Sequence, residues 1–187
     1  MRPRIFIAAL AICVFALPTL AADMTATPYA GQQTRTIKAL SDDDVAALSK
    51  GEGMGMAKAA ELNGYPGPAH VLALVRQLSL TDEQSRQVQL VFDRMNAAAR
   101  SLGGEVIAHE QALDRLFAGG HADHDSVTTE TAAIGDLQGR LRSVHLAAHL
   151  EMRTVLTSDQ IANYLRLRGY VDGVEPPHQH HRPASHR

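Results

Sequence analysis

The sequence predicts an all-helical protein built on a long antiparallel helical hairpin. Residues 82–118 contain no proline, and their apolar side chains recur at alternating spacings of three and four, which is the period of one helix face. The pair Gly119 and Gly120 separates this stretch from a second helical pattern over about residues 126–156. Two long helices joined by a short loop must lie antiparallel, so these features predict a hairpin.

The composition suits helices that pack through alanine and leucine seams. Aromatic residues make up 4% of the chain and tryptophan is absent. The formal net charge of −2 gives no indication of nucleic-acid binding. No nucleophile motif such as Gly-x-Ser-x-Gly is found in the sequence, so we do not expect an enzyme.

Residues 1–22 have the pattern of a signal peptide. Arg2 and Arg4 precede an apolar run over residues 5–17, which is short for a membrane span. We expect cleavage after Ala21 or Ala22 and a periplasmic protein, with an uncleaved anchor as the alternative. The single cysteine lies inside this segment, so the mature chain would contain no thiolate ligand.

The sequence pattern over residues 23–68 predicts an N-terminal segment with short helices. After an irregular stretch to residue 40, Ser41 is a suitable N-cap for a helix that stops at Gly51. A second helix is expected over about residues 54–63, followed by a turn rich in glycine and proline. We expect Met54 and Met56 to pack against other side chains rather than to form a copper-binding cluster.

Residues 69–170 contain the hairpin and a helix at each end of it. The flanking helices are predicted over about residues 70–77 and 158–168, and Gly103-Gly104 is a site where the first long helix can bend. A hairpin with apolar seams on both faces predicts a homodimer. The tail, residues 171–187, is rich in proline and histidine and has too few apolar residues to fold alone.

The same pentapeptide, Leu-Thr-x-x-Gln, begins two of the predicted helices, at residues 80–84 and 156–160. In each copy the threonine can act as N-cap while the glutamine three residues later reaches back to the threonine N–H, which forms a capping box. Two copies in a helix-rich chain with an export signal resemble the Spy/CpxP/zinc-resistance-associated family, which includes heavy-metal sensors.

The resemblance covers about residues 69–170 and implies a function in the cell envelope. It implies that the protein binds or senses metal ions, or that it holds unfolded envelope proteins without ATP, and members of the family combine the two. An inner-membrane regulator is a further partner that the resemblance suggests. A chaperone would use apolar residues beside Arg94, Arg100, Arg140 and Arg142.

His145 and His149 are the strongest candidates for metal ligands. They are four residues apart, and Met152 follows three residues later, so all three side chains share one stripe of a helix. The alternative is a polar edge of the hairpin. Imidazole, thioether and carboxylate ligands without a thiolate predict zinc, copper, nickel or cobalt.

Three further residues could complete such a site. His109 falls on the apolar seam of the first long helix, and Glu110 is adjacent to it. Because a histidine in that position needs a partner, a structural role is the alternative to metal binding. His70 lies near the position at which the resemblance implies ligands ahead of the first pentapeptide.

Overall fold

The computed structural model describes residues 27–171. The predicted signal peptide and the histidines of the tail lie outside these residues. The chain divides into two compact units, Met1–Gln33 and Thr34–Arg187. The described part of the first unit ends within a short 3-10 helix, η1 (Gln32–Thr34), and all features below belong to the second unit.

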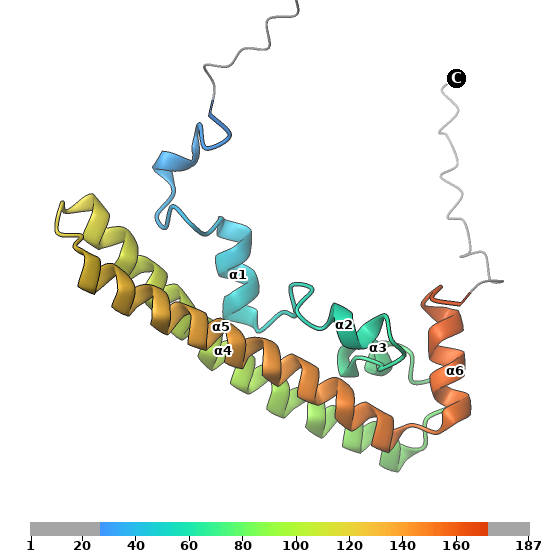
Figure 1. The fold of residues 1–187 in the computed structure, drawn as a ribbon. Coiled ribbons are helices and arrows are strands. Elements are labelled where there is room, and N and C mark those ends of the chain that lie inside the picture. The colour runs from blue at the N-terminus through green and yellow to red at the C-terminus, as the bar shows by residue number, and fades with distance from the viewer. Residues whose placement is uncertain (1–26, 172–187) are drawn as a thin grey trace, which may run out of the picture. The chain divides into compact units, whose positions relative to one another are not determined.

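The second unit is all-helical over its described residues, and a hairpin of two long helices is its largest part (Figure 1). Helix α4 (Asp82–Ala118) has the predicted bounds. Helix α5 (His124–Val155) begins slightly earlier than expected, because the Asp123 side chain caps it through Ser126. The glycine pair in the middle of α4 does not interrupt that helix. Within residues 27–171 no helix is both long and apolar enough to cross a membrane.

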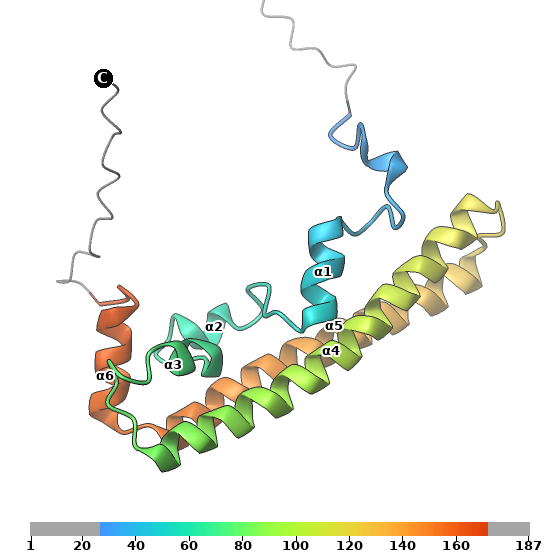
Figure 2. The same cartoon turned by 180° about the vertical axis from the view of Figure 1, so that it is seen from behind.

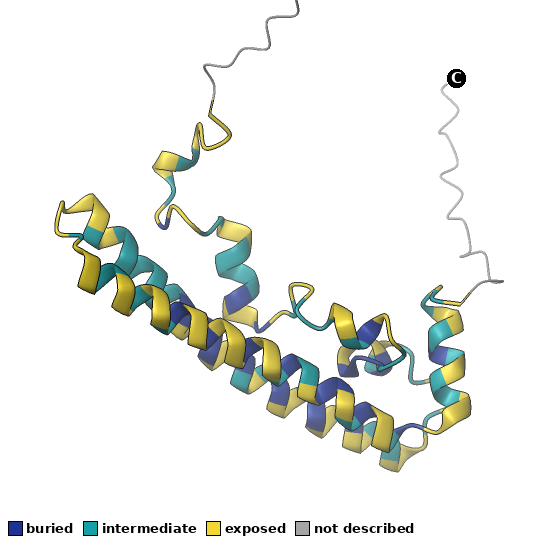
Figure 3. Cartoon of the chain, in the orientation of Figure 1, coloured by how far each residue is buried: buried dark blue, intermediate teal, exposed yellow. Residues whose placement is uncertain are grey.

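The buried faces of α4 and α5 form a continuous seam. Buried side chains on α4 are Val88, Val91, Met95, Ala99, Leu102 and Val106. Those on α5 are Ile134, Leu137, Leu141, His145, Ala148, His149 and Met152. Figure 3 shows that the opposite side of the hairpin is mostly exposed. The seam on α5 therefore continues through both histidines, which are buried and do not form a solvated edge.

Three short helices lie along one side of the hairpin, as Figures 1 and 2 both show. Helix α1 (Asp42–Lys50) has the predicted Ser41 cap and ends at Gly51. Helices α2 (Lys58–Glu61) and α3 (Pro68–Ala73) are shorter than predicted. Helix α2 starts late because Met54 and Gly55 have φ angles of 46° and 76°, which a right-handed helix cannot contain.

Helix α1 packs against α4 at Gly103. A Cβ atom at this glycine would lie 2.3 Å from the carbonyl oxygen of Leu48 in α1. The Asn96 side-chain amide of α4 donates a hydrogen bond to the Lys50 carbonyl at 2.8 Å. The glycine that suggested a bend in α4 therefore permits the close approach of another helix.

Helix α6 (Ser158–Leu167) begins at the second pentapeptide, and α4 begins at the first. Both capping boxes are formed, and the two glutamines also bond to each other. The Gln84 amide donates to Gln160 Oε1 at 2.8 Å, and the Gln160 amide donates to Gln84 Oε1 at 3.0 Å. Each amide also reaches a backbone carbonyl, of Val155 and Leu78 respectively. The repeat thus connects the starts of α4 and α6.

We expect this reciprocal pair to be energetically coupled. Replacing Gln84 or Gln160 by alanine removes half of a capping box and the amide pair, and each change should destabilise the fold by about 1–2 kcal/mol. The double variant should lose about 1 kcal/mol less than the sum, because the shared pair is removed only once. Urea unfolding of the four proteins measures the coupling.

The exposed Gln87 is the matched control, since its amide reaches only the neighbouring Glu83 on the same helix. Gln87→Ala should change stability by less than about 0.5 kcal/mol. Strict additivity of the Gln84 and Gln160 changes would show that the pair does not form in solution.

Candidate functional site

A cavity of about 620 Å³ lies between the short helices, the hairpin and the end of α6. Its polar lining includes Glu61 of α2, His70 of α3 and the two histidines of α5. Phe92, Met95 and Tyr170 are among its apolar and aromatic walls. The cavity therefore brings together residues from the α1–α2 loop, α2, α3, α4, α5 and the end of α6 around a group of titratable side chains.

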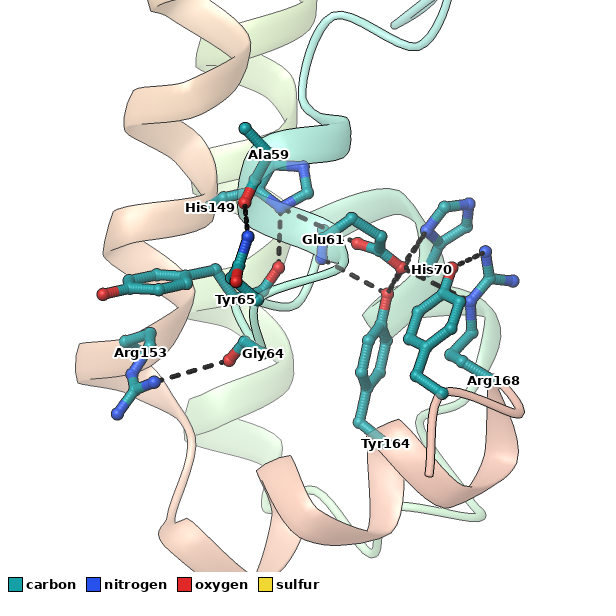
Figure 4. Close-up of polar contacts among 12 residues, drawn as sticks. Ala59, Glu61, Gly64, Tyr65, His70, His149, Arg153, Tyr164 and Arg168 are labelled. Atoms are coloured by element: carbon teal, nitrogen blue, oxygen red, sulfur yellow. Dashed lines mark hydrogen bonds and ion pairs between the residues drawn. The ribbon is translucent and has the colours of Figure 1, made fainter. Parts of the chain in front are cut away.

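Glu61 is the central polar residue of this cavity (Figure 4). It is only 8% exposed, and its Oε1 atom accepts hydrogen bonds from the Tyr164 hydroxyl at 2.5 Å and the Tyr170 hydroxyl at 3.2 Å. The guanidinium of Arg168 forms an ion pair with the same oxygen at 3.4 Å. Burial and the neighbouring carboxylate raise the pKa of Tyr164, so its hydroxyl stays protonated and donates to Glu61.

The other carboxylate oxygen of Glu61 has no such partners. Oε2 is buried without a hydrogen bond, and His149 Nδ1 is 3.7 Å from it. The backbone leaves room here because residue 67 is glycine. A Cβ on Gly67 would lie 3.1 Å from His149 Nε2 and 3.4 Å from Glu61 Oε2. Glu61 Oε2 and the His149 imidazole therefore both lie next to Gly67, where a side chain would crowd them.

A carbonyl group determines the tautomer of His149. Its Nδ1 lies 2.8 Å from the Tyr65 carbonyl oxygen, which can only accept, so Nδ1 carries the proton and Nε2 of the neutral ring has a free lone pair. Arg153 holds this turn in place, because its guanidinium lies 4.9 Å from the centroid of the Tyr65 ring. Its contact with the Gly64 carbonyl is also drawn in Figure 4.

His145 lies one helical turn before His149 and lines the same cavity. It is 4% exposed, and its Nε2 atom has no hydrogen-bond partner. Burial, and to a smaller extent the nearby His149, lowers the pKa of His145. Its imidazole is therefore neutral at pH 7, the form that can bind a metal ion.

His70 reaches the cluster from α3. Its Nδ1 lies 3.4 Å from Glu61 Oε1 and 3.3 Å from the Tyr164 hydroxyl, while its side chain is nearly half exposed. Partial burial, followed by the charge of Arg168, lowers the pKa of His70. The structure thus brings three of the sequence-predicted residues, His70, His145 and His149, to one cavity.

Met152 shares the stripe of His145 and His149 but not the cavity. It is completely buried in the apolar cluster that contains Val71, Val88 and Tyr164. The predicted spacing is present, yet the last position of the stripe points into the core. Its thioether is therefore packed among apolar side chains.

His109 and Glu110 lie elsewhere on the hairpin. His109 Nδ1 is 2.7 Å from Glu130 Oε2 on α5, the partner expected of a structural histidine. Glu130 precedes His145 by 15 positions in α5, or about 22 Å along the axis. Glu110 lines a separate cavity with Lys38 and Asp114, and burial raises its pKa. Neither residue can join the cluster around Glu61.

Glu61 and its partners were not predicted from the sequence. Glu61 belongs to a helix of four residues, too short to show an amphipathic period. Tyr164 and Arg168 reach it from more than 100 residues away in the chain. The only local indication was a single acidic residue in the otherwise apolar stretch Ala59-Ala60-Glu61-Leu62.

In the described conformation of residues 27–171, no three His, Cys, Asp or Glu side chains converge as a ready-made metal-binding group. Glu61 instead makes separate pair contacts with His70 and His149. Comparison with protein-family models, curated proteins and solved structures returned no match to this chain. The resemblance to the Spy/CpxP family therefore rests on the two pentapeptides and stays a prediction.

Proposed function

We propose that this protein binds a divalent metal ion in the cavity around Glu61, with Glu61 Oε2, His145 Nε2 and His149 Nε2 as ligands. The observation that supports this most is that Glu61 Oε2 and His145 Nε2, two atoms able to bind a cation, are both buried without a hydrogen bond in residues that line one cavity. An unsatisfied buried polar group costs about 1–3 kcal/mol. A cation satisfies both atoms at once.

The ligand chemistry narrows the choice of ion. Two neutral imidazoles and one carboxylate suit zinc, and they also accept copper, nickel or cobalt. The tyrosines and Arg168 occupy Glu61 Oε1, so this oxygen is the one turned away from the ion. Since the three ligands do not converge without metal, binding requires side-chain rotation within the cavity.

The biological setting that we propose is the cell envelope. The signal-peptide pattern and the paired pentapeptides favour a periplasmic protein of heavy-metal resistance or sensing, of the Spy/CpxP type. An inner-membrane regulator would be its signalling partner. A homodimer is also part of this proposal, because Leu90 of α4 and Leu150 of α5 are both well exposed on the hairpin.

The alternative of an ATP-independent chaperone for unfolded envelope proteins has less support. Two of the arginines expected to hold clients are in ion pairs, Arg94 with Glu151 and Arg140 with Asp136. Glu61 Oε2 and His145 Nε2, which are buried without a hydrogen bond, have no role in that alternative.

Replacing both His145 and His149 by alanine should weaken zinc binding at least tenfold, or about 1.4 kcal/mol. The reason is the loss of two of the three ligands. Calorimetric titration of the wild type and the variant with zinc measures the change. His109→Ala is the matched control, since this histidine lies on the same hairpin but pairs with Glu130, and it should leave the affinity within about twofold.

A chain that ends at Val171 separates this site from the tail histidines. Deletion of residues 172–187 should remove only weak additional stoichiometry. The sequence of this segment has too few apolar residues to predict independent folding, and a segment of that kind binds metal with little preorganisation. Loss of all zinc binding on this deletion, with binding retained in the double alanine variant, would place the metal site in the tail and contradict the proposal.

A further inference from the structure

A glycine-rich loop between α1 and α2 forms one wall of the cavity. Residues 51–55 all line it. Gly51, Met54 and Gly55 have positive φ angles of 68°, 46° and 76°. Glycine adopts this conformation freely, whereas methionine does so at a cost of roughly 1–2 kcal/mol. Strained residues of this kind concentrate at functional sites.

The loop passes directly beside the unpartnered histidine. A Cβ atom on Gly53 would lie 3.8 Å from His145 Nδ1, and Met54 is the next residue. Met54 lines the same cavity as Glu61, His145 and His149. The strained backbone thus places Met54, the residue after Gly53, at the wall of the cavity that the proposed ligands also line.

Met54 differs from the other methionines of the described chain. Met95 and Met152 are buried in the apolar cluster that contains Val71, Val88 and Tyr164. Met56 packs against a second cluster, which contains Leu48 and Leu141. Met54 is 44% exposed and belongs to neither cluster. Met54 therefore lies outside the core, and its strain is not explained by burial.

We infer that Met54 is a thioether ligand of the cavity site, which extends the ions that the site binds to monovalent copper. This inference rests on the metal site proposed above. Thioether sulfur is a soft donor that selects Cu(I), whereas zinc is well served by imidazole and carboxylate. Gly53 and Gly55 on either side of Met54 allow the loop to bring the sulfur to an ion held by His145 and His149.

The test compares Met54→Leu with Met56→Leu in the full chain. Cys13→Ser is included in every protein, so that methionines supply the only sulfur. Leucine keeps the size and the apolar character of methionine and removes the sulfur. Cu(I) affinity is measured under anaerobic conditions by competition with a chromogenic Cu(I) chelator, and zinc affinity by calorimetry.

Met54→Leu should weaken Cu(I) binding at least tenfold and leave zinc affinity within twofold. Met56→Leu should leave both affinities unchanged. X-ray absorption of the Cu(I)-loaded protein should show a sulfur neighbour that Met54→Leu lacks.

Each other outcome contradicts a specific claim. Unchanged Cu(I) affinity in Met54→Leu, with zinc still bound by the wild type, would overturn the role of Met54 and leave the proposed function standing. An equal loss of Cu(I) and zinc affinity in Met54→Leu would show that Met54 only shapes the loop, which also overturns the inference. Failure of the wild type to bind either ion would overturn the proposed function itself.

Discussion

Gly103→Ala is expected to destabilise the protein by about 3 kcal/mol, the upper end of the range for overpacking. The added Cβ would lie 2.3 Å from the Leu48 carbonyl oxygen and 2.9 Å from the carbonyl carbon. Because both obstacles are backbone atoms, no rotamer change relieves the clash, and α1 must move away from α4. Urea unfolding and hydrogen exchange of the α1 amides measure the effect.

The neighbouring Gly104 is the matched control. A Cβ at this position meets nothing within 4 Å, so Gly104→Ala should stabilise the helix by about 0.5–1 kcal/mol through its higher helix propensity. The two alanine variants are then expected to shift stability in opposite directions. Equal effects would show that α1 does not pack on Gly103 in solution.

Glu61→Ala is expected to destabilise the metal-free protein by about 3 kcal/mol. The change removes the acceptor of two tyrosine hydroxyls and the countercharge of Arg168, and breaking a buried charge pair is strongly destabilising. Removing one partner of a buried pair costs about 3–5 kcal/mol. We expect the lower value because about a third of the Arg168 side chain is exposed. Thermal unfolding should show a melting temperature lower by roughly 6–12 °C.

Two variants separate the contributions to this loss. Tyr164→Phe removes one buried hydroxyl without changing shape and should cost about 1 kcal/mol. Glu52→Ala is the control for a carboxylate in solvent, because Glu52 is largely exposed and its contact with Lys50 spans 3.8 Å, and it should change stability by less than about 0.5 kcal/mol. A Glu61→Ala protein as stable as the wild type would contradict the buried cluster.

The helix starts and the hairpin are features that the sequence predicts well, and the structure agrees on them. Ser41, Thr81 and Thr157 act as N-caps as expected, because a cap is formed by residues three positions apart. The 37-residue helix α4 has the predicted bounds, since its apolar period repeats over ten turns. The position of His145 and His149 on one stripe likewise follows from helix geometry alone.

The short helices show where local patterns are insufficient. Helix α2 starts later and ends earlier than predicted, and α3 both starts and ends earlier. The reason is that elements of four to six residues are stabilised by the surfaces on which they pack. The turn that contains Gly64 and Tyr65 was predicted. Its role in holding His149 was not, because the contact spans 84 positions in the chain.

By itself, the sequence determined the two long helices, the caps at Ser41, Thr81 and Thr157 and the side-chain stripes, because those depend on hydrogen bonds and spacings within a few residues. Only the tertiary structure decided which stripe residues face a cavity and which face the core, so that His145 lines the cavity and Met152 is packed. It also decided that Glu61 is buried among Tyr164, Tyr170 and Arg168. The reason is physical: burial depends on which distant surfaces meet, and a spacing rule along one helix contains no information about its neighbours.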